Sequence, residues 1–257
     1  MADHCQPEVG QAPGAYTWTY TVASFDVDIS RQLRLSTQLK LQQEVGELHL
    51  RENGFPYAYL YDELGVVFVL TRASSVRYRA PIFGEKVQIT TWSRGLKGAQ
   101  YTRCYRFCDQ AGEILIDSVT TFALIDAKTH ALIRPSTISA FQRFVHLPQR
   151  ENTCPRPGKI ILPEEMELAD IRKLYDSDMD YNGHLNNTIY ADFISDYMPG
   201  GMRDKILTGF QIHFAGEARM GQSLEIAVAG MENKAYFTGR HTDGLCFEAA
   251  CTFKLQG

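Results

Sequence analysis

One order of sequence patterns occurs twice along this chain, and it limits the folds that the chain can adopt. A strand pattern, a helix pattern and four more strand patterns fill residues 18–125, and the same order returns over residues 168–254. Consecutive strands that follow a single helix are typical of α+β proteins with antiparallel sheets. We therefore predict an internal duplication, in which each half combines one helix with one sheet.

Hydrophobic periodicity places the individual elements. The first half should begin with a strand from Trp18 to near Asp28, followed by a helix over about Leu33–Glu52 that buries Leu41, Val45 and Leu48. The helix of the second half carries an apolar stripe at Tyr190, Phe193, Ile194 and Tyr197. The remaining predicted strands are Val66–Tyr78, Val87–Trp92, Ala99–Cys108, Glu113–Ile125, Leu168–Tyr175, Leu207–Ala215, Ser223–Met231, Lys234–His241 and Leu245–Lys254.

The composition changes between the two halves. From about residue 127 to 164 prolines recur, and cations stand among few acids, which is typical of a linker with at most a short helix. We accordingly divide the chain into a flexible tail (1–14), an N-terminal domain (15–135), a linker (136–165) and a C-terminal domain (166–257).

The densest polar motif is Asp178-Met-Asp-Tyr-Asn-Gly-His-Leu-Asn-Asn187. Its Asp180, Asn182 and His184 alternate, so an extended segment would point all three side chains the same way. The helix pattern follows directly, and the backbone N–H groups at a helix start can hold an anion or a developing oxyanion. The alternative is an ordinary turn at Asn182-Gly183 with N-cap residues behind it.

The first half lacks the polar side chains of this motif. When Asp28-Ile-Ser-Arg-Gln-Leu33 is laid on Asp180-Tyr-Asn-Gly-His-Leu185, Ser30 replaces Asn182 and Gln32 replaces His184. Laying Pro81–Val87 on Ala218–Leu224 puts Ala80 opposite Glu217. The alignment predicts a duplicated fold in which only the second half is chemically active.

Composition narrows the function further. The net charge of -4 and a pI near 6.0 disfavour a nucleic-acid-binding protein, and no apolar run reaches the length of a membrane span. The six cysteines show no metal-binding spacing, and no signature of a nucleotide or metal cofactor is present. We expect a cytoplasmic protein with no cofactor, no metal, no nucleic-acid partner and no stable membrane insertion; a homodimer is compatible with all of these features.

At these residues the chain resembles the acyl-acyl-carrier-protein thioesterases of bacterial type, a family of tandem hotdog domains. Asp180-Tyr-Asn-Gly-His-Leu-Asn-Asn187 is similar to the family's Asp-x-Asn-x-His-x-Asn-Asn signature, and Ile212–Gly221 resembles the strand that carries its catalytic Glu, here Glu217. The resemblance implies an α+β double hotdog, each with a long helix wrapped by an antiparallel sheet. It also implies that the N-terminal domain holds the acyl chain and that acyl carrier protein delivers it.

Thioester hydrolysis needs an activated water and a stabilised oxyanion. Asp180 or Glu217 can accept the proton of the water, Asn182 can orient the water or the thioester, and His184 can relay a proton or hold a carboxylate. We predict that these four residues are the catalytic set, although each alone has a structural interpretation. Many plant members carry a Cys after the Glu, but Ala218 stands here, so we predict direct attack by water.

Three other functions remain open at this level: hydrolysis of acyl-coenzyme A, hydration or dehydration of an enoyl thioester, and binding of acyl thioesters without catalysis. Hotdog hydratases carry Asp-x-Asn-Pro-x-His, with one residue more than the spacing found here. Aromatic residues around Phe55 and Phe68 line an acyl tunnel or simply form the core. Docking of an acidic carrier protein would require a local basic patch, and the linker cations Arg143, Arg150, Arg156 and Lys159 are the first candidates.

Overall fold

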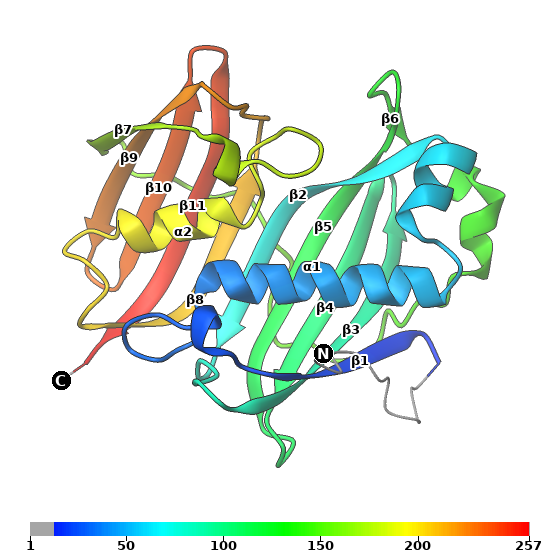
Figure 1. Cartoon of the computed structure of the whole chain (residues 1–257), viewed down its shortest axis with the longest axis horizontal. Helices are drawn as coiled ribbons and strands as arrows, with labels where there is room; N and C mark the ends of the chain where they lie inside the picture. Colours follow the sequence, from blue (N-terminus) through cyan, green and yellow to red (C-terminus); the bar gives the residue numbers. More distant parts are fainter. Residues whose placement is uncertain (1–12, 257) are drawn as a thin grey trace.

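The computed structural model describes residues 13–256, and two helices and one large sheet dominate it (Figure 1). Most of the predicted tail, residues 1–12, lies outside the described residues. The helices are α1 (Leu35–Glu52) and α2 (Ile189–Asp196). The strands are β1 (Ala15–Thr21), β2 (Val66–Arg77), β3 (Lys86–Lys97), β4 (Gln100–Cys108), β5 (Ile114–Asp126), β6 (Leu132–Ile133), β7 (Glu167–Lys173), β8 (Lys205–Phe214), β9 (Ser223–Met231), β10 (Lys234–His241) and β11 (Gly244–Leu255).

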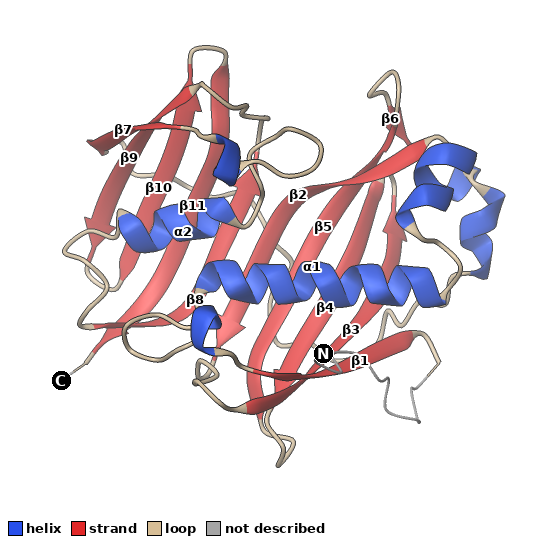
Figure 2. Cartoon of the chain, in the orientation of Figure 1, coloured by secondary structure: helices blue, strands red, loops and turns tan. Residues whose placement is uncertain are grey.

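The strands of the two halves form one continuous sheet (Figure 2). Its order is β1-β3-β4-β5-β2-β8-β11-β10-β9-β7, with β6 paired to β5 at the side, and every pairing is antiparallel. The order of the second half is therefore the order of the first half in reverse, and the halves meet where β2 pairs with β8. This arrangement confirms the predicted α+β class.

α1 lies across one face of the first half of the sheet and contacts α2 (Figure 1). The predicted apolar face is confirmed, because Leu41, Val45 and Leu48 are buried in a cluster with residues of β1 and β3. Asn53 ends the helix by donating from its side-chain amide to the carbonyl of His49 at 2.8 Å. No helix within residues 13–256 has the length and apolarity needed to cross a membrane.

A second, polar face of α1 was missed in the sequence. Gln38, Gln42 and His49 are each at most 2% exposed and lie against the sheet. Gln38 and Gln42 donate to hydroxyls of β2 and β5, and Gln42 reaches the Ser118 hydroxyl at 2.8 Å. Periodicity identifies apolar stripes only. A stripe of glutamines therefore has the sequence pattern of a solvent-exposed face, even where the fold buries it.

Two predicted strands end earlier than their apolar patterns do. β1 stops at Thr21, because the Asp26 carboxylate accepts hydrogen bonds from the Ala23 N–H at 2.8 Å and the Tyr20 hydroxyl at 2.6 Å and closes a turn. β7 ends at Lys173, because the Asp178 carboxylate accepts a hydrogen bond from the Tyr175 N–H at 2.9 Å and closes a similar turn.

Asp178 is therefore not a solvated loop charge. It is 5% exposed and forms a two-pronged ion pair with Arg172, with both contacts at 2.8 Å. Side-chain hydrogen bonds to backbone groups compete with strand pairing in this way, and periodicity does not detect them.

The linker between the halves packs on the sheet instead of standing free. Burial opposes ionisation of Asp117, but hydrogen bonds from Arg106 and Thr153 outweigh it and hold the pKa of the carboxyl below its ordinary value. Thr153 donates to Asp117 through both its N–H and its hydroxyl, each at 2.8 Å. The guanidinium of Arg150 stacks 4.6 Å from the Trp92 ring centroid, so this cation is used inside the fold.

We predict that Asp117→Asn lowers the free energy of unfolding at neutral pH by about 3 kcal/mol, because one partner of a buried ion pair is lost. A carboxyl whose folded pKa is depressed stabilises above its unfolded pKa near 4, and this stabilisation is lost as the pH falls through the folded pKa. The gap between wild type and variant in denaturant titrations should therefore narrow on acidification. Glu113→Gln, on an exposed turn nearby, is the matched control, and equal stability of both variants at neutral pH would contradict the prediction.

Candidate functional site

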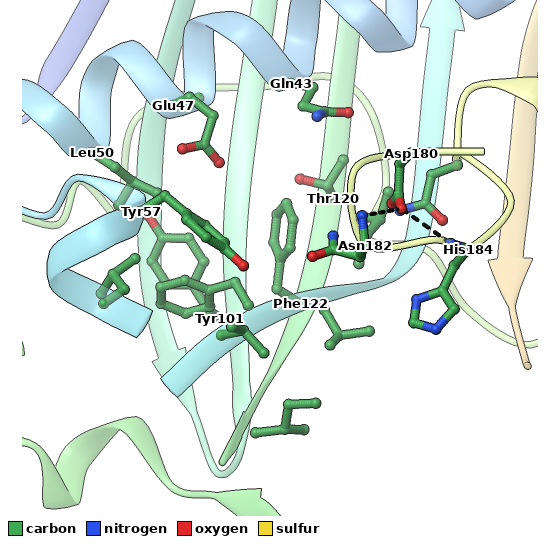
Figure 3. A pocket seen from close by; sticks show the side chains of 18 of the residues that line it. Gln43, Glu47, Leu50, Tyr57, Tyr101, Thr120, Phe122, Asp180, Asn182 and His184 are labelled. Carbon is green, nitrogen blue, oxygen red and sulfur yellow. Dashed lines mark hydrogen bonds between the residues drawn. The ribbon is translucent and has the colours of Figure 1, made fainter. Parts of the chain in front are cut away.

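A cavity of about 650 Å³ lies between α1 and the sheet of the first half. Its walls come from both halves of the chain. α1 and strands β2, β4 and β5 supply one part, and the loop before α2 supplies the other. Figure 3 shows Asp180, Asn182 and His184 at one end of the cavity, with Leu50 and Tyr57 toward the opposite end. Glu217 also borders it, so all four predicted site residues line one cavity.

The loop that carries three of these residues is a tight turn, and the expected extended alternation is wrong. One carboxylate oxygen of Asp180, Oδ1, accepts from the Asn182 N–H at 2.8 Å and the His184 N–H at 3.2 Å. The Asp180 N–H donates to the carbonyl of His184 at 2.8 Å. Gly183 takes a positive φ of 78°, where a side chain would be strained. Within residues 13–256 the other carboxylate oxygen, Oδ2, has no hydrogen-bond partner.

The first half contains the same turn without the same side chains. Asp28 Oδ1 accepts from the N–H groups of Ser30 and Gln32 at 2.8 and 3.1 Å, and Arg31 takes the positive φ at 60°. The backbone of Gln32 forms an isolated antiparallel β-bridge with Ile82, and the backbone of His184 forms the matching β-bridge with Arg219. These paired contacts match the register of the sequence alignment. They also show that an aspartate at this position has a structural role of its own.

Glu217 faces His184 from a segment that follows β8. Its Oε2 lies 3.1 Å from His184 Nε2 and 3.6 Å from Arg219 Nη2, while 54% of the side chain is exposed. His184 Nε2 can donate to the carboxylate, which leaves Nδ1 as the acceptor of a neutral ring.

Two further residues position Glu217, and no motif in the sequence points to either of them. The side chain of His241 donates from Nε2 to the carbonyl of Glu217 at 3.0 Å, and its Nδ1 accepts from the Asp243 N–H. At Gly216 a Cβ would lie 2.8 Å from the Leu245 carbonyl oxygen, so only glycine fits at this position without a shift of the backbone. The sequence indicates only a hairpin turn at His241–Gly244.

The start of α2 provides fewer free N–H groups than expected. The Leu185 N–H donates to the Ala218 carbonyl at 2.8 Å, and the Asn186 N–H donates to the Asp178 carbonyl at 2.9 Å. Both are therefore excluded as oxyanion donors, because backbone pairing between the loop and its neighbours uses them. The Asn187 N–H has no acceptor among the described residues, and the residue borders the cavity.

The aromatic residues of the first half divide between the cavity and the core. Tyr57, Tyr61 and Phe68 line the cavity, whereas Phe55 is fully buried and packs with Phe141 and Phe144. Part of the aromatic set therefore lines the cavity and part belongs to the core; that the cavity holds an acyl chain stays a prediction.

None of the cysteines that the structure describes lines the cavity. Cys104, Cys154, Cys246 and Cys251 are buried, and Cys108 is partly buried. Burial raises the pKa of Cys246 to about 11 and of Cys251 to about 12, which disfavours the reactive thiolate. Cys5 lies outside the described residues. Residues 13–256 contain no group of three or more His, Cys, Asp or Glu side chains that could hold a metal ion.

Two family profiles match most of the chain. The acyl-ACP thioesterase N-terminal domain matches residues 13–137, and the acyl-ACP thioesterase C-terminal domain matches residues 165–250. Among curated proteins, oleoyl-acyl carrier protein thioesterase 2 of Arabidopsis thaliana is 24% identical over 207 residues, which are 72% of this chain and 54% of the relative. Dodecanoyl-[acyl-carrier-protein] hydrolase of Cinnamomum camphora is 21% identical, and the matched region covers 87% of this chain and 62% of the relative's length. The chain thus spans little more than half the length of these relatives.

Solved structures share the fold. An acyl-ACP thioesterase from Bacteroides thetaiotaomicron superposes with a TM-score of 0.79 at 20% identity, covering 94% of this chain and 98% of the other. The 12:0-ACP thioesterase from Umbellularia californica gives a TM-score of 0.82 at 16% identity, covering 96% and 100%. At these identities the likeness concerns the fold alone, and it confirms the predicted tandem hotdog.

The repeated turn gives a prediction about stability. Asp28→Ala and Asp180→Ala should each lower the free energy of unfolding by about 1 kcal/mol, because two N–H groups lose an acceptor at a partly exposed site. Asp28→Asn and Asp180→Asn should lower it much less, because the amide oxygen still accepts. Denaturant titration of the four variants tests this, and a loss confined to position 180 would show that the two turns are not equivalent.

Proposed function

Because the chain belongs to the family of acyl-acyl-carrier-protein thioesterases, we propose that it hydrolyses the thioester of a fatty acyl chain on acyl carrier protein. The products are the free fatty acid and the thiol of the carrier. The observation that carries the proposal is the shared cavity, because Asp180, Asn182, His184 and Glu217 border one end of a space that continues along α1. Release of free thiol from acyl carrier protein, measured over a series of chain lengths, tests it.

The two halves divide the work in this proposal. Residues 15–135 hold the acyl chain between α1 and the sheet, residues 136–165 connect the halves, and residues 166–257 carry the catalytic set. The lining of the cavity supports this division, since α1, β2, β4 and β5 belong to the first half and the polar loop to the second. The turn at Asp28 keeps the backbone of the active loop but offers Ser30 and Gln32 in place of Asn182 and His184.

Asp180 acts as the general base through Oδ2. Its Oδ1 is held by two N–H groups, so the carboxylate has a fixed orientation and one oxygen left to accept a proton from water. Glu217 instead fixes the ring and the tautomer of His184 through the 3.1 Å contact.

The oxyanion that forms on the thioester carbonyl requires donors. The Asn187 N–H and the side-chain amide of Asn182 take this role, because both residues border the cavity and the N–H groups of Leu185 and Asn186 are already used. Water attacks directly, since Ala218 follows Glu217 and none of the described cysteines lines the cavity.

Asp180→Asn should reduce kcat by at least about a hundredfold, as expected for a lost general base, while the amide oxygen preserves the turn. Glu217→Gln should cause a loss of similar size, but only Asp180→Asn should remove the acidic limb of the kcat/KM profile against pH. Gln32→Ala, at the equivalent position of the first half, is the control and should retain activity. If Glu217→Gln removes the limb and Asp180→Asn does not, Glu217 is the base.

The rival functions differ in product or substrate. A hydratase would convert an enoyl thioester to a hydroxyacyl thioester without releasing thiol, and a binding module would release none from any substrate. An acyl-coenzyme A thioesterase would prefer the coenzyme to the carrier protein. We further propose the cytoplasm as its location; the plant relatives named above are chloroplastic.

Carrier-protein docking is proposed beside the site and not on the linker. Arg143 stacks on Phe55 and Arg150 on Trp92, so these linker cations are engaged by the fold. Lys173 and Arg219 are exposed and lie near the segment that carries Glu217, where the Leu174 N–H donates to the Gln222 carbonyl. Lys173 also contacts the Tyr175 ring and Arg219 the Glu217 carboxylate, so their position beside the site, and not a lack of contacts, favours them. A positive rim here would attract an acidic carrier protein.

Lys173→Glu should raise KM for acyl carrier protein and flatten its salt dependence, because rim charges act on association and are screened over about 8–10 Å. Turnover of a short acyl-coenzyme A should change far less. Lys159→Glu, an equal charge reversal on the linker, is the control. A larger rise of KM from Lys159→Glu than from Lys173→Glu would show that the docking surface lies on the linker.

A further inference from the structure

The middle of the cavity is polar, although a fatty acyl chain is hydrocarbon. α1 presents Gln43 and Glu47 to the cavity, and the sheet presents Arg103 and Thr120. Figure 3 shows Gln43 and Thr120 next to the catalytic loop and Glu47 one helical turn farther along α1. Beyond them the lining becomes apolar or aromatic, with Leu50. The polar groups therefore flank the path of the chain, not its far end.

Arg103 is a cation with spare hydrogen-bonding capacity. It is 2% exposed, and its Nη1 contacts His49 Nδ1 at 2.8 Å and the Thr91 hydroxyl at 3.2 Å, while Nη2 donates to the Tyr101 hydroxyl at 2.9 Å. Three of the five N–H donors of a guanidinium are thus used. No carboxylate of the described residues lies within 4 Å of it, so a buried positive charge borders the cavity without a direct counter-ion.

Glu47 provides the opposite charge without touching it. Its carboxylate makes no hydrogen bond or ion pair with any residue from 13 to 256, and it borders the open cavity. Glu47 is exposed. Partial burial by the surrounding protein still raises the pKa of its carboxyl, and the positive charge of Arg103 opposes that rise. α1 approaches the strand closely here, since a Cβ on Gly46 would lie 3.7 Å from Arg103 Cδ.

An unsubstituted chain in this position would bury an unpaired carboxylate and leave donors of Arg103 unsatisfied, which is costly. A hydroxyl on the chain satisfies both groups, because it donates to a carboxylate and accepts from a guanidinium. An oxo group can only accept, and a second carboxylate would be repelled by Glu47.

We propose that the cavity selects acyl chains that carry a hydroxyl on an internal carbon, with Glu47 accepting from that hydroxyl and Arg103 donating to it. This inference rests on the proposed thioesterase function and specifies its substrate class. A site built to hydrogen-bond a hydroxyl discriminates strongly against the analogue that lacks it, because its polar groups are then left unpaired.

The test compares acyl carrier proteins loaded with plain and hydroxylated chains of equal length, with the hydroxyl moved along the chain. For one hydroxyl position, kcat/KM of the wild type should exceed that of the plain chain by at least about tenfold. Glu47→Leu should shift this ratio at least about tenfold toward the plain chain. Glu44→Leu, on the same helix but outside the cavity lining, should leave the ratio unchanged.

Calorimetric binding of the free hydroxylated and plain fatty acids to wild type and Glu47→Leu gives a second readout that needs no turnover. If the wild type binds the hydroxylated acid more tightly than the plain acid and Glu47→Leu loses this preference, the inference is supported. Failure to cleave any thioester would overturn the proposed hydrolysis but not this inference. Preference for the plain chain at every hydroxyl position, in binding as in turnover, would overturn the inference and leave these groups as a site for water only.

Discussion

The pairing of β2 with β8 is the contact on which the rest of the structure depends. It joins the two half-sheets, and it brings the strand that leads to Glu217 beside the strand that forms a cavity wall. The approach is close enough that a Cβ at Gly209 would lie 2.7 Å from the Ser75 carbonyl oxygen. Because backbone hydrogen bonds set this distance, the polar loop of one half is fixed against the helix of the other, and the candidate site exists only where the halves meet.

The duplicated halves use one backbone for two purposes. The same aspartate turn, with a residue of positive φ at the same place, closes the loop at Asp28 and at Asp180. The helices differ, since α1 has 18 residues and α2 has 8. The long helix extends over the sheet far enough to enclose a cavity, and the loop of the other half closes its end. The asymmetry between the halves thus lies in helix length as well as in side chains.

Polar groups inside the first half set limits on what the cavity can hold. Glutamines, hydroxyls and the Arg103–His49 contact replace part of the apolar surface that usually seals a helix onto a sheet. His49 accepts from Arg103 through Nδ1, and burial together with this cation lowers the pKa of His49 to about 3, so the ring is neutral at physiological pH. Satisfied polar contacts of this kind rigidify a wall and give it directional preferences that hydrocarbon alone lacks.

The sequence by itself determined the α+β class, the strand and helix order, the duplication and its register, because these follow from local periodicity and turn chemistry. It also singled out Asp180, Asn182, His184 and Glu217, which the tertiary structure gathers on one cavity. Only the tertiary structure decided that the loop is a turn, that the N–H groups of Leu185 and Asn186 are used, and that Gln42, Arg103 and Asp178 are buried. These features depend on contacts between residues distant in sequence. The local sequence around a polar residue does not indicate whether the fold will supply a hydrogen-bond partner for it.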